Sequence, residues 1–248
     1  MSVPELDAHE VHVWDDRIVG PDAQRPAPPD DLSRLLSGDE VERAERYRYP
    51  ADRQRFVRGR TVLRLLIGAY TGAAPESVQI VTDGLGKPSA QLPGGPSPVH
   101  FSVSHSGSLV AWALSRSPVG IDVEMFDPAR FDDLVVGAVC SPHEAEDLSR
   151  LTGDARTRAF FRLWVRKEAV LKAWGNGLNL APATVQVRAS PTTLTGPDGT
   201  AWRVQDVSVA EGYASAVAQG GAAWRVRLLG PVGGGGDRGV AGGKPRPA

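Results

Sequence analysis

The chain has 248 residues, 41% of them hydrophobic, which is enough for one large domain or two small ones around a sizeable core. Its 28 basic and 29 acidic residues leave a formal net charge of −1, which argues against a nucleic-acid partner because such binding needs a basic surface. The single cysteine, Cys140, excludes an internal disulfide and a cysteine-based zinc site.

The N-terminal segment, residues 1–7, lacks both a basic start and the apolar stretch of about 7 to 15 residues that marks a secretory signal. Nowhere do about 18 apolar residues follow one another, so no membrane-spanning helix is expected. With the lone cysteine, these features predict a soluble protein of the cytoplasm that has no membrane partner.

The first half of the chain contains patterns of both strands and helices. After a first strand at 11–14 and a proline-rich loop at 21–29, helical periodicity predicts helices at 30–49 and 52–70. Alternating polar and apolar residues then predict strands at 78–82, 99–104, 109–115 and 119–124.

The second half repeats this mixture. Helices are predicted at 128–136, 142–151 and 154–174, and strands at 184–188, 201–209, 214–218 and 224–228. The long helices that end near Gly72 and Gly177 occupy comparable places, although the two halves are too different in sequence to prove a repeat. Residues 230–248 are rich in Gly and Pro and are expected to be a disordered tail.

Two carboxylates share one face of the strand predicted at 119–124. Its apolar residues alternate with Gly120, Asp122 and Glu124, so both acids point to the same side. Their Cα atoms would be on the order of 7 Å apart, close enough for their oxygens to converge on one hard cation such as Mg²⁺. The alternative is a half-buried strand whose polar face only meets water.

The helix predicted at 154–174 carries an acid and a base on one stripe. Trp164, Glu168 and Lys172 follow one another at intervals of four, and Gly175 and Gly177 supply stop signals. Glu168 and Lys172 could form an ordinary solvated ion pair. Their position beside Trp164, in a helix with other large apolar residues, favours burial instead.

A third segment, residues 101–107, alternates like a strand and ends in a turn signal before the next alternating run. Ser104 and His105 would then lie at the strand end, where donors can meet an anion, although a single His is more often a structural residue. Upstream, Lys87 and Pro88 follow two glycines in a turn that lacks the spacing of a phosphate-binding P-loop.

Taken in order, these segments resemble the Sfp-type 4′-phosphopantetheinyl transferases of bacteria over about residues 30–220. The motifs are Gly-Lys-Pro, Phe-Ser-Val-Ser-His-Ser, Gly-Ile-Asp-Val-Glu and Phe-Phe-x-x-Trp-x-x-Lys-Glu-Ala-x-x-Lys-x-x-Gly-x-Gly-Leu. The last motif, residues 160–178, is highly specific, and the others carry the resemblance through their joint order and spacing.

The resemblance implies an α+β fold of two similar α/β lobes, related by a pseudo-twofold axis, with the active site in the cleft between them. Residues 1–117 would form the N-terminal lobe, which contacts the phosphates and adenine of coenzyme A. Residues 118–229 would form the C-terminal lobe, which carries the metal acids and the catalytic helix. A monomer is expected.

The resemblance further implies a reaction. The 4′-phosphopantetheine arm of coenzyme A would be transferred to a serine hydroxyl of an acyl, peptidyl or aryl carrier protein, with release of adenosine 3′,5′-bisphosphate. Attack on a pyrophosphate needs charge neutralisation, an in-line nucleophile and a stabilised leaving group. Mg²⁺ is the expected metal, with Mn²⁺ as a possible substitute.

Site residues follow from the same resemblance. Asp122, Glu124 and Glu168 match the family's metal-binding acids, and Glu168 is also the candidate general base. Lys172 matches the lysine that contacts the pyrophosphate, so Asp122, Glu168 and Lys172 form the expected catalytic group. Lys167 is assigned as a second phosphate contact.

The remaining assignments concern coenzyme A. By the resemblance, Ser104 and His105 would hold a phosphate of the nucleotide, and Lys87 with Pro88 would lie along the adenine or its ribose.

The helix predicted at 52–70 carries five arginines, where well-known bacterial relatives have a lysine-rich entry. Arg53 and Arg60 are seven residues apart and fall on nearly the same face, so they are assigned to the 3′-phosphate of coenzyme A. Arg55 and Arg58 could equally be solvated.

Glu144 matches a family acid, but with Ser141 it also forms a capping box that starts a helix.

Two other functions remain open from the sequence. A different Mg²⁺-dependent phosphotransferase would need its own nucleotide loop, but no Walker or kinase-type glycine motif is present. A non-catalytic module that binds coenzyme A or a carrier protein would not need the three acids for chemistry.

Carrier docking has candidate residues that could equally belong to the core, namely Phe126, Phe131 and residues 134–136.

Overall fold

The protein is described by a computed structural model that covers residues 2–18, 30–84, 86–175, 180–187, 189–221, 223–232 and 240–241. The proline-rich loop expected at 21–29 and the end of the last motif, residues 176–178, lie outside these described ranges. Within them, no helix is long and apolar enough to cross a bilayer.

The first half of the chain runs through β1 (Glu10–Arg17), the 3₁₀ helix Asp30–Leu35, α1 (Gly38–Glu45), α2 (Pro50–Thr71), the 3₁₀ helix Pro75–Ser77, β2 (Gln79–Thr82), β3 (Pro88–Leu92), β4 (Gly95–Pro96), β5 (His100–Ser106) and β6 (Leu109–Ser115). The second half runs through β7 (Val119–Met125), the 3₁₀ helix Pro128–Arg130, α3 (Asp133–Val139), α4 (Pro142–Ser149), α5 (Gly153–Trp174), the 3₁₀ helix Pro182–Thr184, β8 (Thr192–Thr195), β9 (Ala201–Asp206), β10 (Tyr213–Gly220), β11 (Arg225–Pro231) and β12 (Val240–Ala241).

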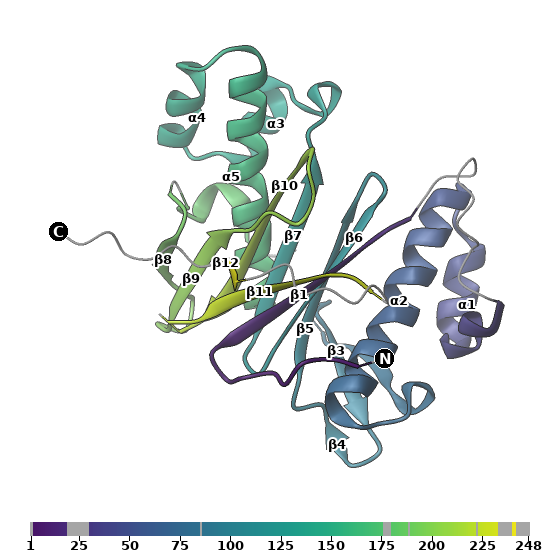
Figure 1. Cartoon of the computed structure of the whole chain (residues 1–248). Helices are drawn as coiled ribbons and strands as arrows, with labels where there is room; N and C mark the ends of the chain where they lie inside the picture. The colour runs from purple at the N-terminus through teal and green to yellow at the C-terminus, as the bar shows by residue number, and fades with distance from the viewer. Residues whose placement is uncertain are drawn as a thin grey trace.

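These strands form three sheets (Figure 1). The first has the order β12-β11-β1-β6-β5, the second β7-β10-β9-β8, and a small third sheet has β2-β3-β4. The late strand β11 returns to pair in parallel with β1, so both ends of the chain contribute to the first sheet. β5 and β7 are the edge strands at which the first and second sheets meet.

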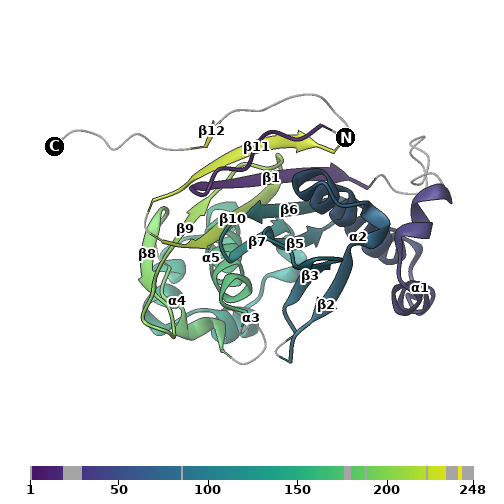
Figure 2. The same ribbon diagram turned by 90° about the horizontal axis from the view of Figure 1, so that it is seen from below.

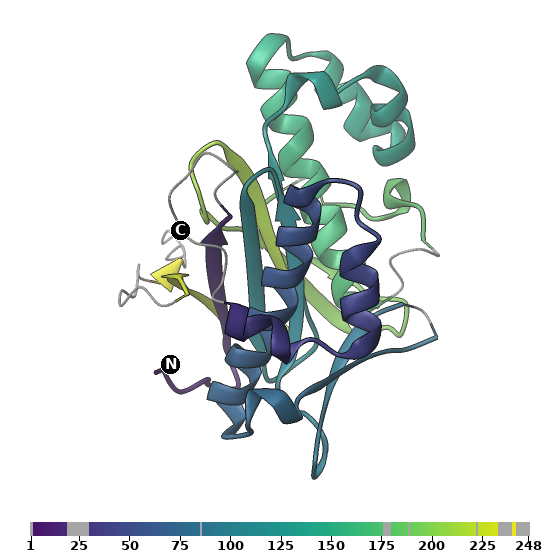
Figure 3. The ribbon, with the colours of Figure 1, turned by 90° about the vertical axis from the view of Figure 1, so that its right-hand side faces the viewer.

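Each of the two larger sheets has a long helix against it. One stripe of α2 buries Val62, Leu63, Leu66 and Ile67 in a core shared with Trp112 of β6, and α1 and α2 lie together on this side of the molecule (Figure 3). Helix α5 packs on β7 and β10. Viewed from below, β5 and β7 lie between α2 and α5 (Figure 2).

The two halves have a similar order of elements. Helices α2 and α5 both have 22 residues, and both end at a left-handed glycine, Gly72 or Gly175. Each is followed by a short 3₁₀ helix that begins with proline. The α+β, two-lobed fold expected from the sequence is therefore confirmed.

Several predicted elements have different bounds. The helix expected at 30–49 is divided because Ser37 and Glu40 form a capping box that starts α1. The helix expected at 128–136 is divided in the same way, since the side chain of Asp132 caps a new helix, α3. The strand expected at 184–188 is wrong over its described residues: Thr184 ends the 3₁₀ helix Pro182–Thr184, and residues 185–187 form a bend and irregular chain.

The sequence did not indicate β3, β4, β8 or β12, which are short and lack a clear alternation. The expected tail begins at Gly230, whereas β11 continues to Pro231 and β12 pairs with it at Val226 and Arg227. Residues 233–239 and 242–248 lie outside the described ranges.

Candidate active site where the two sheets meet

Gly120 brings α5 close to the acidic strand β7. A Cβ at this position would lie 2.0 Å from the carbonyl oxygen of Ala169 and 2.6 Å from the amide nitrogen of Ala173, both in α5. Because Gly120, Asp122 and Glu124 share one face of β7, the glycine lets the helix approach the same face that carries the acids. This approach brings Glu168 and Lys172 to Asp122.

Asp122 lies at the centre of the cluster and is 4% exposed. Its Oδ1 accepts hydrogen bonds from Lys172 Nζ at 2.7 Å and from Ser104 Oγ at 2.7 Å. Its Oδ2 is buried and has no hydrogen-bond partner among the residues that the structure describes. A buried carboxylate oxygen without a partner is costly, so a further ligand at this atom would be stabilising.

Glu124 lies two residues along the same strand. Its Oε2 accepts from Ser106 Oγ at 2.6 Å and from the Arg130 guanidinium at 2.9 Å. The Arg130 side chain is 51% exposed, so this ion pair is screened by solvent and contributes little stability. Asp122 and Glu124 are thus each held by one serine and one cation.

The Glu168 carboxyl has an unusual electrostatic environment. Burial raises its pKa above the ordinary value of 4.5, and the nearby charge of Asp122 raises it further. Lys172 acts in the opposite direction, and Glu124 adds a smaller upward contribution. Asp122 and Glu124 therefore lie close enough to Glu168 to disfavour its negative charge, and a bound cation would relieve this repulsion.

The donor set fits a hard divalent cation in chemistry, because it offers carboxylate oxygens, one of which is buried and unpaired. In the described part of the chain, however, no three His, Cys, Asp or Glu side chains are gathered closely enough to form a finished metal site. Lys172 and Arg130 occupy the oxygens that face them. These two cations partly neutralise the acids in the arrangement seen here.

A cavity of about 420 Å³ adjoins the acidic cluster, with Glu168 and Lys172 in its wall. Side chains from α1, α2, β5 and α5 line it together with the segment 86–88. Among the described residues, five cationic side chains, from residues 43, 55, 60, 87 and 172, line the cavity with one acid, Glu168. Phe56, Leu63, Phe101 and Val103 supply apolar surface. This composition suits an anion that also carries an aromatic group.

The α1 and α2 side of the cavity is built around Phe56. The guanidinium carbons of Arg43 and Arg60 lie 5.0 Å and 5.7 Å from its ring centre, and the Tyr47 ring lies at 5.5 Å. Arg55 extends across to donate to the carbonyl oxygen of Gly107 at 2.8 Å. These stacked and hydrogen-bonded arginines are held in place before any ligand arrives.

Lys87 and Pro88 also line the cavity, but the Lys87 ammonium is already engaged. Its Nζ donates to the carbonyl oxygen of Ala173 at 2.6 Å, at the C-terminal end of α5. Burial lowers the pKa of Lys87, and the carboxylate of Asp83 partly offsets this. Lys87 therefore links the first half of the chain to the helix of the second half.

His105 lines the cavity as well. Burial lowers the pKa of its imidazole, and the positive charges of Arg55 and Lys172 lower it further. Near neutral pH it is therefore a neutral hydrogen-bonding group. Ser104 is only 6% exposed, and its hydroxyl bonds to Asp122 and Lys172, so the side chain serves the acidic cluster.

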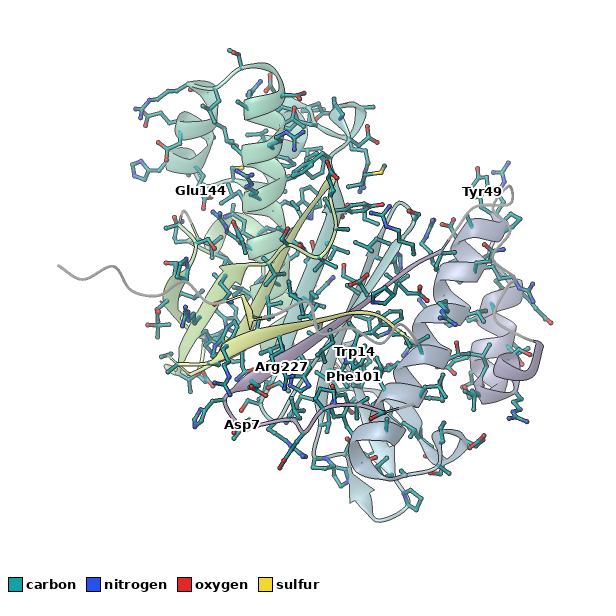
Figure 4. The ribbon with its side chains drawn as sticks, viewed as in Figure 1. Asp7, Trp14, Tyr49, Phe101, Glu144 and Arg227 are labelled. Carbon is teal, nitrogen blue, oxygen red and sulfur yellow. The ribbon has the colours of Figure 1, made fainter. Side chains whose placement is uncertain are left out.

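Lys167 does not reach the cavity. Its side chain is fully buried, and its ammonium bonds to the carbonyl oxygens of Pro182 and Val185 and pairs with Glu144 at 2.8 Å. The assignment of Lys167 as a phosphate contact is contradicted, because adjacent helix positions point in different directions. Glu144 forms the capping box with Ser141 and lies far from Phe101 of the cavity (Figure 4).

Of the two arginines assigned to a phosphate, only Arg60 lines the cavity. Its Nε is 3.4 Å from Glu40 Oε1, whereas Arg53 is exposed and is not among the lining residues. Arg55, which the sequence left open as a solvated residue, also lines the cavity, whereas Arg43, Tyr47 and Phe56 were missed. Their only signal is a spacing of four between Arg43 and Tyr47 and between Phe56 and Arg60 in the helices predicted at 30–49 and 52–70, although α1 ends before Tyr47.

Comparison with known proteins gives the same assignment to both halves. Residues 118–218 match the 4′-phosphopantetheinyl transferase superfamily, and residues 29–117 match a model described as 4′-phosphopantetheinyl transferase, N-terminal. The 4′-phosphopantetheinyl transferase HetI of Nostoc sp. is 32% identical over 88% of this chain and 91% of its own length. The 4′-phosphopantetheinyl transferase psf-1 of Bacillus pumilus is 32% identical over 75% of this chain and 79% of its own.

A third relative, the 4′-phosphopantetheinyl transferase Sfp of Bacillus subtilis, is 29% identical over 69% of this chain and 76% of its own. The chain belongs to the 4′-phosphopantetheinyl transferase superfamily. It is an enzyme of the class that transfers phosphopantetheine to carrier proteins, with coenzyme A as the family's substrate.

Proposed function

We propose that this enzyme transfers the 4′-phosphopantetheine moiety of coenzyme A to a serine hydroxyl of apo acyl, peptidyl or aryl carrier proteins, in a Mg²⁺-dependent reaction. One observation carries the proposal: a cavity of about 420 Å³ with an arginine and aromatic wall opens onto a cluster of three carboxylates and one lysine. A nucleotide with several phosphates, next to a reacting pyrophosphate, needs both parts.

Coenzyme A would lie with its phosphates among Arg43, Arg55 and Arg60, since guanidinium groups bind phosphate through paired N–H donors. The Phe56 ring and the neighbouring apolar side chains would pack against the adenine. His105, neutral near pH 7, would donate one hydrogen bond to a phosphate oxygen. Lys87 and Pro88 complete this wall.

Glu168 would act as general base for the incoming serine. Its raised pKa makes the carboxylate a better proton acceptor than an ordinary glutamate. The serine oxygen forms a bond to the β-phosphorus, the phosphorus–oxygen bond within the pyrophosphate breaks, and adenosine 3′,5′-bisphosphate leaves. Lys172 lies beside Asp122 and would stabilise the charge on the departing phosphate.

Asp122, Glu124 and Glu168 would hold Mg²⁺, or Mn²⁺ in its place. When bound, the cation supplies charge neutralisation at the pyrophosphate oxygens. Carrier docking would use the neighbouring surface of α3, where Leu134 is 85% exposed while Val136 is buried.

The intact mass of an apo carrier protein tests the reaction directly. After incubation with this enzyme, coenzyme A and Mg²⁺, we expect a gain of about 340 Da, the mass of the phosphopantetheine group that becomes covalently attached. The gain should be lost with EDTA and restored by added Mg²⁺ or Mn²⁺. Absence of a gain with acyl, peptidyl and aryl carriers would overturn the proposal, and an equal gain with EDTA would overturn its metal dependence.

A further inference from the structure

Three serines of β5 are hydrogen bonded to the backbone of β7. The hydroxyl oxygens of Ser102, Ser104 and Ser106 accept from the amides of residues 121, 123 and 125 at 3.1, 3.3 and 3.1 Å. β5 and β7 belong to different sheets. We call these three residues the serine ladder. It joins the two sheets through side chains where a continuous sheet would have backbone bonds.

Two members of the serine ladder make a second bond to an acid. Ser104 Oγ donates to Asp122 Oδ1 at 2.7 Å, and Ser106 Oγ donates to Glu124 Oε2 at 2.6 Å. A hydroxyl has one proton and two lone pairs. The amide that it accepts from therefore helps to fix the direction in which it donates. The third member, Ser102, accepts from the amide of Ile121, and the residue that precedes Ile121 on β7 is Gly120, which has no side chain to bind.

Ser106 is the member whose role can be isolated. It is 6% exposed and the Glu124 side chain 14%, so water competes weakly for their bond. The other partner of the same oxygen, Arg130, is half exposed and held only loosely. Ser104 is less suitable for a test, because its hydroxyl also contacts Lys172.

We infer that Ser106 is a positioning residue, which holds the Glu124 carboxylate in the orientation that the catalytic cation requires. This inference rests on the proposed function, in which Glu124 is a metal ligand. Groups that hydrogen bond to a ligating carboxylate fix its orientation, and removing one typically weakens metal binding by 10- to 100-fold. Nothing in the sequence motif distinguishes Ser106 from Ser102, because only the register with β7 assigns an acid to one and a glycine to the other.

Direct Mn²⁺ binding tests the inference. Free Mn²⁺ is measured by electron paramagnetic resonance during titration of the enzyme with saturating coenzyme A, after subtraction of the Mn²⁺ held by coenzyme A alone. For Ser106→Ala we expect Mn²⁺ binding weaker by about tenfold. Ser106→Thr keeps the hydroxyl and should restore the affinity to within about threefold of wild type.

Ser102→Ala is the matched control, since it removes a bond to a β7 amide but no bond to an acid. It should lower the melting temperature, by no more than Ser106→Ala does because it breaks one hydrogen bond and not two, while changing Mn²⁺ affinity by less than about twofold. Equal Mn²⁺ affinity for wild type and Ser106→Ala, or equal weakening in both alanine variants, would overturn the inference alone. A wild-type enzyme that binds no Mn²⁺ would overturn the proposed metal site, and the role of Ser106 with it.

Discussion

At Glu168, the electrostatic environment of the side chain directly affects the role proposed for it in catalysis. It is held near Asp122 and Glu124 by a helix that packs closely on β7, and its pKa is raised mainly by burial. The ionised carboxylate is destabilised in this position, and binding a proton, a cation or the hydroxyl of a serine would reduce this destabilisation. The same side chain is therefore expected to influence both turnover and stability, in opposite directions.

Glu168→Gln should retain the fold and lose transfer activity by about 10²- to 10⁴-fold, because the amide cannot accept the serine proton. The rate is measured as holo-carrier formed per unit time under saturating coenzyme A, and circular dichroism checks the fold. A rate within threefold of wild type would contradict both roles assigned to Glu168.

The same variant should be more stable than wild type at neutral pH in the absence of metal. The folded protein binds the Glu168 proton more tightly than the unfolded chain does, so wild type loses stability as the pH rises from about 4.5 through the raised pKa. Glutamine does not titrate and avoids this loss. Melting temperatures measured in EDTA should therefore diverge above that range and converge below it, and a difference that does not depend on pH would contradict this account.

At the scale of elements, the packing of α5 on β7 is the contact that creates the site. It depends on Gly120, which has helix backbone where a side chain would be, and on the small residues Ala214, Ala216 and Ala218 of β10. A larger residue at Gly120 would move the helix, and with it Glu168 and Lys172, away from the acids of β7.

Gly120→Ala should destabilise the protein by about 1 to 3 kcal/mol or more, because the new methyl group would meet backbone atoms at 2.0 and 2.6 Å. Transfer should fall together with stability. Gly137→Ala in α3 is the control: nothing lies within 4 Å of its Cβ position, so it should be neutral or stabilising by up to about 1 kcal/mol. Urea unfolding measures the free energy of unfolding of both variants, and a similar loss of stability in the two would contradict the packing argument.

The sequence predicts most accurately the strands and helices whose apolar and polar residues repeat with a clear period. The alternation around Asp122 and the helical spacing of Trp164, Glu168 and Lys172 predicted β7 and α5 correctly, and with them the face that carries the acids. Lys167 was misplaced because a resemblance assigns a residue to a motif without stating which way its side chain points. Arg53 was preferred to Arg55 because a shared helical face gives no information on how far along the helix the cavity extends.

At the scale of the whole molecule, two further long-range contacts tie the halves together in addition to the serine ladder. β11 returns to pair with β1, and Lys87, far from α5 in sequence, donates to the last turn of that helix. Neither could be derived from local patterns, because both depend on how distant segments pack. The motif Gly-Lys-Pro suggested a ligand contact, whereas the Lys87 ammonium bonds to the protein itself across the boundary between the halves.

Lys87→Met should lower the free energy of unfolding by about 1 to 3 kcal/mol, since it keeps the apolar stem and removes a charged hydrogen bond to a partly buried carbonyl. Arg150→Gln is the comparison: the side chain of Arg150 is 67% exposed in its pair with Glu146, and its loss should change stability by less than about 0.5 kcal/mol. Chemical denaturation measures both, and an equal effect would show that Lys87 does not link the halves.

The serine ladder between β5 and β7 also affects how this joint can change over generations. Almost every residue type has the backbone N–H and C=O groups that pair neighbouring strands, so a substitution seldom removes such a hydrogen bond. Here three of the bonds between the sheets depend on hydroxyl groups at Ser102, Ser104 and Ser106. The joint of this enzyme is therefore encoded in side chains, and single nucleotide changes can loosen it by one hydrogen bond at a time.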